Sequence, residues 1–356
     1  MDILDRYIGK TIAMGVLAVL FVMLTLDSLI SFAGETEDIG RANYDVWQAI
    51  KFVLLNIPQK LYRLFPMIAL LGTMMSLGML ASNSELIAIR AAGVSVLRIT
   101  LSVLKTGVIL AALVIVIGEF IAPPAIQYAK LERVAAMERK ISLNTDYGLW
   151  ARDTNNYIHI RRVENDGRLI GVNLYIFDDS QNLIETINAA SASYMEIQEQ
   201  WQLYRVTRNK ISPNAIEKSV LPTMQWKSLL NPEVVSVVSV TPENLSIWKL
   251  RGYIEYLKDN QLDSREYELS FWSKVIAPVT IAVMIVLAVP FVFGSLRNVG
   301  AGQRIVVGFL LGLGFYIFNQ LIAKAGLVYE LPPILSAMVP TFIVMVFGGI
   351  LLTKTR

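Results

Sequence analysis

The chain has 356 residues, of which 54% are hydrophobic and only 17% charged, and its mean hydropathy is +0.51. This apolar share indicates an integral membrane protein, and a formal net charge of +3 is too small to indicate nucleic acid as a partner. The sequence has no cysteine and one histidine, which excludes disulfides, thiol catalysis and cysteine-bound zinc and argues against a Ser-His-Asp triad.

Hydrophobic runs long enough to cross a bilayer, about 20 residues each, occur on both sides of a polar middle. In chain order they cover residues 11–30, 52–80, 99–121, 271–293, 305–322 and 334–352. Proline removes a backbone donor, so we expect a bend or a late helix start near Pro58 and Pro66. Pro123 and Pro124 are expected to end the third run. The first run lacks a signal-peptide cleavage site and is expected to be an uncleaved anchor.

Lysine and arginine concentrate in the connections on one side of these runs, and the positive-inside rule assigns that side to the cytoplasm. Both termini are then cytoplasmic, and the polar middle, residues 127–268, lies outside. The basic residues that set this orientation are Arg6, Lys10, Arg90, Arg98, Arg297, Arg304, Lys354 and Arg356.

The polar middle has the alternation and the turn signals of short β-strands. Strand-like stretches cover residues 157–163, 168–177, 183–197, 201–210 and 234–240. The segments Asn165-Asp166-Gly167 and Asp178-Asp179-Ser180 are turn signals. Short strands with polar turns predict an antiparallel sandwich or jelly roll. From residue 244 to residue 259 the period becomes helical, and the apolar face consists of Ile247, Leu250, Ile254 and Leu257.

The stretch SELIAIRAAGVSVLRI, residues 84–99, lies between two hydrophobic runs and carries three charges. Its pattern predicts a short amphipathic helix with Gly93 as a stop. One interpretation is an interfacial helix that lies on lipid, but such helices carry more lysine and a larger apolar face. This short, alanine-rich stretch better fits a helix that inserts into a groove of a cytoplasmic protein.

Several basic residues lie near the outer ends of the runs, against the simple positive-inside expectation. They are Lys51, Lys60, Arg63, Lys130, Arg133, Lys274 and Lys324. Their side chains could snorkel to outer headgroups, or they could bind an anionic amphiphile, because lysine and arginine pair strongly with phosphate. The residues alone leave both interpretations open. Asp27 and Glu119 also lie near the outer ends of the runs, and both could pair with these bases.

Other motifs are weaker. Gly9-Lys10-Thr11 resembles the end of a phosphate-binding loop, but Leu4 replaces its first glycine, so we do not expect this chain to hydrolyse ATP. Gly308, Gly312 and Gly314 are expected to let helices pack closely. His159 has no partner in the sequence pattern, and a surface or sheet-edge position is expected.

Several longer segments together carry a specific resemblance that runs the length of the chain. They are LDRYIGKTI from Leu4, RLFPMIALLGTMMSLGML from Arg63, NSELIAIRAAG from Asn83, GEFIAPP from Gly118, GLWARDTNNYIHI from Gly148, YELSFWSKVIAPV from Tyr267 and VYELPPILSAMVP from Val328. On these segments the chain resembles the lipopolysaccharide export permeases of the LptF/LptG family, and most closely its LptG branch.

The resemblance implies an α-helical membrane protein of six transmembrane helices, three plus three, with an inserted periplasmic all-β domain like a jellyroll. Residues 1–126 would form helices one to three with a cytoplasmic coupling helix at 84–93, residues 127–262 the periplasmic domain with connecting helices, and residues 263–356 helices four to six. It also implies the inner membrane of a Gram-negative bacterium.

The implied function is extraction of lipopolysaccharide from the outer leaflet of that membrane and delivery to a periplasmic bridge towards the outer membrane. The implied partners are the permease LptF, two copies of the ATPase LptB, and LptC with, through the bridge, LptA. No cofactor is expected on this chain, since ATP and Mg²⁺ would be used by the ATPase. The alternatives are an LptF-type partner subunit and a membrane-anchored periplasmic scaffold or binding protein without a transport role. A membrane enzyme lacks a plausible nucleophile or metal cluster in this sequence.

The resemblance also implies two sets of functional residues. Those expected to couple to the ATPase are Ser84, Glu85, Leu86, Ile87, Ile89, Arg90 and Gly93. Those expected to bind lipopolysaccharide are Lys60, Arg63, Lys130 and Arg133 for the phosphates and Phe65, Met67 and Ile68 for the acyl chains. The family's LptG branch often has lysines just after the first helix, whereas this chain has SFAGETEDIG with Glu35, Glu37 and Asp38. Phosphate recognition is therefore expected to depend on the four basic residues.

Overall fold

The computed structural model describes residues 3–137, 149–153, 156–164, 167–178, 180, 182–196, 198, 200–212, 215–227, 241–293 and 300–354. The chain divides into two compact units. The first, here the helical unit, comprises Met1–Glu37, Ala49–Ala129 and Arg265–Arg356, and the second, the sheet unit, comprises Asp38–Gln48 and Lys130–Ser264. The predicted boundaries at residues 126 and 262 lie close to two of these divisions.

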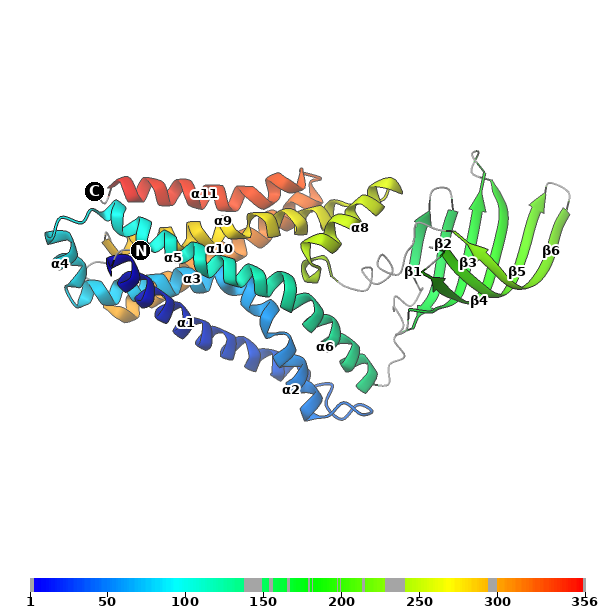
Figure 1. Cartoon of the computed structure of the whole chain (residues 1–356), viewed down its shortest axis with the longest axis horizontal. Helices are drawn as coiled ribbons and strands as arrows, with labels where there is room; N and C mark the ends of the chain where they lie inside the picture. The colour runs from blue at the N-terminus through cyan, green and yellow to red at the C-terminus, as the bar shows by residue number, and fades with distance from the viewer. Residues whose placement is uncertain are drawn as a thin grey trace. The chain divides into compact units, whose positions relative to one another are not determined.

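Within these described residues six helical segments are long and apolar enough to cross a membrane, as predicted from the hydrophobic runs. Along the chain (Figure 1) the helices are α1 (Ile3–Glu35), α2 (Val46–Leu55), α3 (Ile57–Ser82), α4 (Glu85–Ala91), α5 (Val96–Val116), the π-helix η1 (Ile117–Ile121), α6 (Ala122–Ala136), the 3-10 helix η2 (Pro242–Asn244), α8 (Ile247–Asp259), α9 (Arg265–Phe293), α10 (Ala301–Val328) and α11 (Pro333–Lys354). The spans α1, α3 and α5 precede the β-strands, and α9, α10 and α11 follow them.

The second hydrophobic run forms two helices. α2 ends at Leu55 and α3 begins at Ile57, so Pro58 lies in the first turn of α3, where a missing N–H costs nothing. This confirms the late start expected at Pro58. Pro66 lies inside α3, which continues past it.

The third run does not end at Pro123 and Pro124, and that prediction is wrong. α5 passes into η1 and then into α6, which contains both prolines and continues to Ala136. In a π-helix each N–H bonds five residues back, so the turn is wider than in an α-helix. We attribute the continuity to η1, because a wider turn just before two prolines relieves the clash that their rings would make with preceding carbonyls.

The core of the helical unit forms where α3 lies against α1, α5 and α9. Ile8, Ile12 and Val16 of α1 recur every four residues and are at most 1% exposed. They pack in one cluster with Phe65 and Ile68 of α3. α3 is therefore the central span, with 72% of its most apolar window buried within the chain, against 11% for α1 and for α10.

The described strands form one antiparallel sheet in which each strand pairs with the next. They are β1 (Leu149–Asp153), β2 (Asn156–Val163), β3 (Leu169–Phe177), β4 (Leu183–Met195), β5 (Gln200–Ser212) and β6 (Ala215–Trp226). This confirms the antiparallel β domain. Among the described residues the strand order is sequential. The jelly-roll arrangement, which has Greek-key connections between two sheets, stays a prediction. The predicted strand at 234–240 lies outside the described residues, and β1 and β6 were not predicted.

Two further sequence signals of the sheet unit are realised. At the β3–β4 turn the Asp178 carboxylate accepts hydrogen bonds from the backbone N–H of Ser180 and Asn182, and these bonds hold the pKa of Asp178 below its usual range. α8 begins after Ser246, whose hydroxyl accepts a hydrogen bond from Lys249 N–H. The buried face of α8 includes Leu250, Ile254 and Leu257, as predicted.

Candidate functional site

The short helix α4 lies at the end of the helical unit where α1 begins and α11 ends (Figure 1). Ser84 turns the chain out of α3 with a left-handed backbone (φ 61°), and α4 starts at the next residue. Leu86 is 3% exposed and anchors the helix, with Ile89 also packed against the core. Ile87 is 51% exposed and Arg90 is exposed as well. α4 therefore has one anchored face and one face free of the rest of the unit.

Glu85 is held in place by α1. Its Oε2 accepts a hydrogen bond of 2.5 Å from the Tyr7 hydroxyl, and Asn83 Nδ2 lies 3.4 Å from its Oε1. A hydrogen bond to a carboxylate is stronger than one between neutral groups. The orientation of α4 is thus linked to the first turns of α1, a contact that the sequence did not predict.

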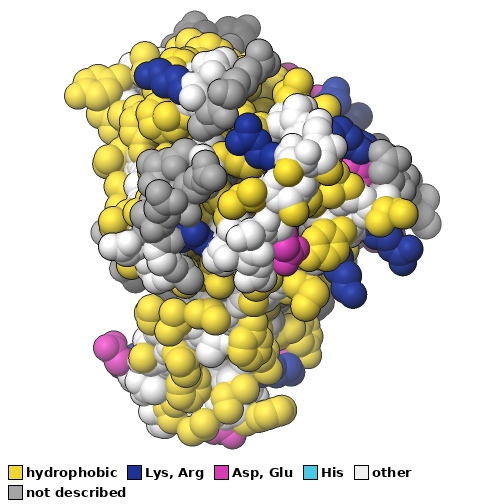
Figure 2. Space-filling model, turned by 90° about the vertical axis from the view of Figure 1, so that its left-hand side faces the viewer, with side chains coloured by type: hydrophobic (Ala, Val, Ile, Leu, Met, Phe, Trp, Pro, Cys, Tyr) yellow, Lys and Arg dark blue, Asp and Glu magenta, His cyan; other side chains and the backbone are white. Residues whose placement is uncertain are grey.

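Ser84, Glu85, Leu86, Ile87, Ile89, Arg90 and Gly93 therefore belong to one element or to its two ends. Gly93 has a φ of +89°, which favours glycine, and it follows the end of α4 at Ala91 as a helix stop. Figure 2 shows this end of the molecule, where basic side chains are scattered among hydrophobic and neutral ones. The structure brings these predicted residues together, and their role in coupling stays a prediction.

Lys60 and Arg63 meet at the other end of the spans, on Asp27 of α1. Lys60 Nζ lies 2.8 Å from Asp27 Oδ2 and donates a 2.5 Å hydrogen bond to Ser31 Oγ. Arg63 Nη2 lies 3.6 Å from Asp27 Oδ1. The predicted pairing of Asp27 with a base is confirmed. Lys60 is only 9% exposed, whereas half of the Arg63 side chain is exposed, so Arg63 is the more accessible of the two cations.

Phe65, Met67 and Ile68 lie in the core rather than on a lipid-facing surface. They are 1%, 5% and 0% exposed and belong to the cluster that joins α3 to its neighbours. Met67 also lies against Gly312 of α10, where a Cβ would clash with the methionine side chain. These residues can line a lipid cavity only when the helices around α3 part.

Lys130 and Arg133 lie on α6 in the sheet unit. Arg133 Nη2 pairs with Asp38 Oδ2 at 2.6 Å, and Arg41 also pairs with Asp38. Lys130 is half-buried. The acidic segment after α1 thus supplies a carboxylate to Arg133, one of the bases expected to bind phosphate. An incoming phosphate would have to compete with Asp38 for this guanidinium.

A buried ion pair joins η1 to α9. Lys274 Nζ lies 2.5 Å from Glu119 Oε1, and the two side chains are 6% and 12% exposed. The same ammonium lies 5.1 Å from the centre of the Tyr62 ring, within the range of a cation–π contact. Glu119 was expected to pair with a base, and this contact confirms it. The π-helix that carries Glu119 was not expected.

Two other sequence candidates are accounted for by packing. His159 lies on β2, between β1 and β3, so it is half-buried and not at a sheet edge. Its Nδ1 is 3.1 Å from Asn173 Nδ2, and its ring is 4.7 Å from that of Trp150. Gly308 and Gly312 face Leu71, Met74 and Met67 of α3, as expected for close packing, whereas a Cβ on Gly314 would meet nothing within 4 Å.

Within the described ranges no three histidine, aspartate or glutamate side chains come close enough to hold a metal ion. The charged clusters described above are lysine and arginine side chains that pair with Asp27, Asp38 and Glu119. Such an arrangement can bind or release anionic groups and can hold helices together.

Comparison of the sequence with known proteins shows which family the chain matches. The family described as "Lipopolysaccharide export system permease LptF/LptG" matches residues 6–354. The lipopolysaccharide export system permease protein LptG of Haemophilus influenzae (strain ATCC 51907 / DSM 11121 / KW20 / Rd) is 37% identical over 353 residues, 99% of each chain. The protein of the same name from Escherichia coli (strain K12) is 38% identical over 340 residues, which are 95% of this chain and 94% of the relative.

Proposed function

Because the chain belongs to the LptF/LptG family of lipopolysaccharide export system permeases, we propose that it extracts lipopolysaccharide from the outer leaflet of the inner membrane and passes it to a periplasmic bridge. The chain is a permease subunit of that export system, it corresponds to LptG, and it acts with LptF. It is a multi-pass protein of the inner membrane. It is a transport subunit and not itself a catalytic enzyme. The observation that carries the proposal is the family match over residues 6–354.

ATP would be hydrolysed, with Mg²⁺, by a separate ATPase, two copies of LptB. We assign the contact with LptB to α4. The geometry of α4 supports this role, because Leu86 anchors the helix, Glu85 links it to α1, and Ile87 and Arg90 face outwards. An exposed helix of this kind suits a groove on a partner protein. A movement of α4 would reach α1 through the Tyr7–Glu85 hydrogen bond.

The lipid A phosphates would be bound by Lys60, Arg63, Lys130 and Arg133. Each of Lys60, Arg63 and Arg133 already has a carboxylate partner, so phosphate would exchange for Asp27 or Asp38 rather than meet a bare cation. The acyl chains would enter between helices and contact Phe65, Met67 and Ile68. Closure of the ATPase would then favour the state that holds the lipid less tightly, and this difference in affinity is what drives release.

The expected orientation puts both termini and α4 in the cytoplasm and the sheet unit in the periplasm. The ends of the described helical unit, Ile3 and Lys354, lie with α4 at one end of the spans, which supports a shared side (Figure 1). The sheet unit would join the periplasmic bridge with LptC and LptA.

The test is co-expression with LptF and LptB, purification in detergent and mass spectrometry of the bound lipid. A stable complex that retains lipopolysaccharide is expected. A well-folded chain that purifies without LptF or LptB and carries no lipopolysaccharide would overturn the proposal and favour a scaffold role.

A further inference from the structure

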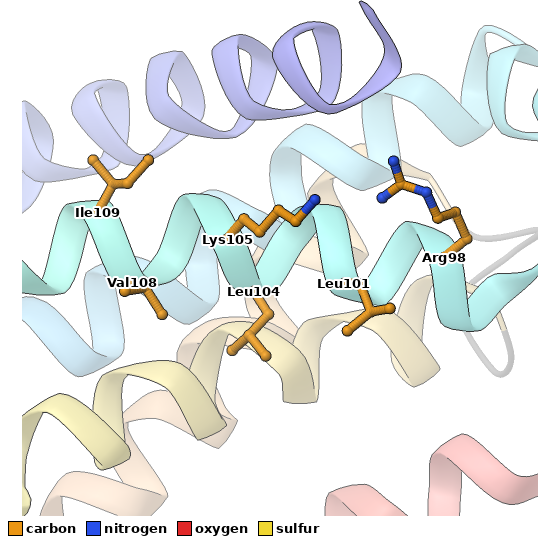
Figure 3. A pocket seen from close by; sticks show the side chains of 6 residues that line it. All are labelled: Arg98, Leu101, Leu104, Lys105, Val108 and Ile109. Carbon is orange, nitrogen blue, oxygen red and sulfur yellow. The ribbon is translucent and has the colours of Figure 1, made fainter. Parts of the chain in front are cut away.

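A groove of about 680 Å³ runs along the outer face of α5, outside the clusters assigned to lipopolysaccharide and to the ATPase. It is lined by Arg98, Leu101, Leu104, Lys105, Val108 and Ile109. Figure 3 shows Arg98, Lys105 and Ile109 on one side of the helix and Leu101, Leu104 and Val108 on the other. The groove therefore combines two cations with an apolar track.

The two cations of the groove share a buried carboxylate. Asp5 of α1 lies 2.8 Å from both Arg98 Nη1 and Lys105 Nζ, and its Oδ1 also accepts a 2.5 Å hydrogen bond from Ser102. The Asp5 side chain is 1% exposed, whereas 32% of Arg98 and 51% of Lys105 are exposed. The carboxylate is therefore buried, and the two cations face outwards.

The depth of these residues matches the layers of a bilayer. Arg98 lies at the start of α5, and Lys105 lies nine residues after Val96, about 13 Å along the axis at 1.5 Å per residue. The Lys105 side chain reaches back towards the Arg98 end of the helix (Figure 3), as a lysine does when it snorkels to the headgroup layer. Leu101 and Val108 are 46% and 56% exposed, and Val108 lies further along the span than Lys105.

We propose that this groove binds an anionic glycerophospholipid, with its phosphate at Arg98 and Lys105 and an acyl chain along Leu101, Leu104 and Val108. The two cations face outwards, and lysine and arginine suit a phosphate. A bilayer presents both groups in the required order, phosphate in the headgroup layer and hydrocarbon beneath it. A bound lipid would fasten α5 to α1 through the two cations that also hold Asp5.

The test uses the purified export complex in detergent and native mass spectrometry. Phosphatidylglycerol and phosphatidylethanolamine with the same acyl chains are titrated in parallel, and preferential retention of phosphatidylglycerol is expected. Val108→Trp fills the groove without touching an ion pair and should lower this retention about tenfold. Leu113→Trp is the matched control, because Leu113 is a 59% exposed residue of α5 outside the groove, and it should leave retention unchanged.

Lys105→Gln should also lower phosphatidylglycerol retention about tenfold, as expected for the loss of a charge-assisted hydrogen bond. It also removes a partner of Asp5, so Val108→Trp, which keeps both ion pairs of Asp5, is the independent test. Equal retention of both lipids, or no effect of Val108→Trp, would overturn the proposal. Stronger retention of lipid A than of phosphatidylglycerol would also overturn it, because the groove would then not prefer a glycerophospholipid. So would a Val108→Trp variant that keeps phosphatidylglycerol but no longer binds LptF, because the groove would then be a contact surface for LptF.

Discussion

At the scale of single residues, three carboxylates within the spans each hold a basic partner: Asp5, Asp27 and Glu119. A charge in a low-dielectric interior costs several kcal/mol, and a close partner offsets most of this cost. Removing one partner of such a pair is therefore expected to lower stability strongly, because the other charge then stays in the interior. Glu119 and Lys274 are the most buried pair of the described spans and give the sharpest test.

Lys274→Met should destabilise the helical unit by about 3–5 kcal/mol, because it removes the ammonium that lies closest to the buried Glu119 carboxylate. The double variant Lys274→Met with Glu119→Leu should recover most of this loss, since apolar groups of similar size replace both charges. Thermal unfolding of the purified chain in detergent measures both effects.

Arg251→Met on α8 is the control for this comparison. Arg251 and Glu255 are 68% and 65% exposed, and loss of an exposed pair costs at most about 1 kcal/mol. If the double variant is as unstable as Lys274→Met alone, Lys274 stabilises the helical unit by something other than its ion pair with Glu119.

At the scale of elements, α1 and α3 approach closely because small residues lie where they cross. A Cβ on Gly15 would clash with Ser76, and one on Gly72 would clash with the backbone and side chain of Val16. Ser76 Oγ lies 3.0 Å from the carbonyl of Thr11 and 2.8 Å from that of Gly72, so it also links the two helices. Small residues allow such contacts between transmembrane helices.

Gly72→Val should therefore push α1 away from α3 and cost about 1–3 kcal/mol or more, as overpacking of an interior does. Gly314→Val is the matched control, because a Cβ at that position meets nothing within 4 Å. Since the sequence has no cysteine, a pair of cysteines placed on α1 and α3 can report their distance by its cross-linking rate. Equal cross-linking and equal stability in the two glycine variants would contradict this account of the contact.

The helices were largely predictable, because hydrophobicity over 20 residues is a strong signal and the bilayer permits few other structures. Their boundaries were not. A proline pair normally ends a helix, but η1 relieves the clash at Pro123 and Pro124, and no residue signal announces a π-helix. β6 was missed because its sequence, AIEKSVLPTMQW, shows little apolar alternation. Both faces of the strand are largely exposed, and Ile216 and Val220 are 67% and 72% exposed.

The sequence allowed us to predict which residues belong to the candidate site, but not most of the contacts that they make. Positions near the outer ends of spans indicated that Asp27 and Glu119 would find bases, and they do. The links from Tyr7 to Glu85 and from Asp5 to Lys105 join residues 78 and 100 positions apart. Such links depend on which helices become neighbours, and a single sequence carries no local signal for that.

At the scale of the whole helical unit, one end concentrates contacts that tie α1 to the neighbouring helices. Asp5 of α1 holds Arg98 and Lys105 of α5, and Tyr7 of α1 holds Glu85 of α4. A force applied to α4 would therefore act on α1, whose own window is only 11% buried within the chain. Away from its contacts with α3, α4 and α5, α1 has exposed apolar side chains that a partner could contact, among them Phe21 and Ile30.

Glu85→Ala in the complex with LptF and LptB should reduce lipopolysaccharide release per ATP hydrolysed about tenfold, as expected for the loss of a charge-assisted hydrogen bond. Tyr7→Phe separates two reasons for this effect, because it removes the 2.5 Å bond to α1 and keeps the carboxylate on α4. If Glu85 contacts LptB directly, Tyr7→Phe should retain most of the release. If Glu85 acts by fixing α4 to α1, the two variants should be equally defective. Normal release in both variants would show that α4 does not transmit the movement through Glu85, and the coupling would then have to be carried by its exposed face around Ile87 and Arg90.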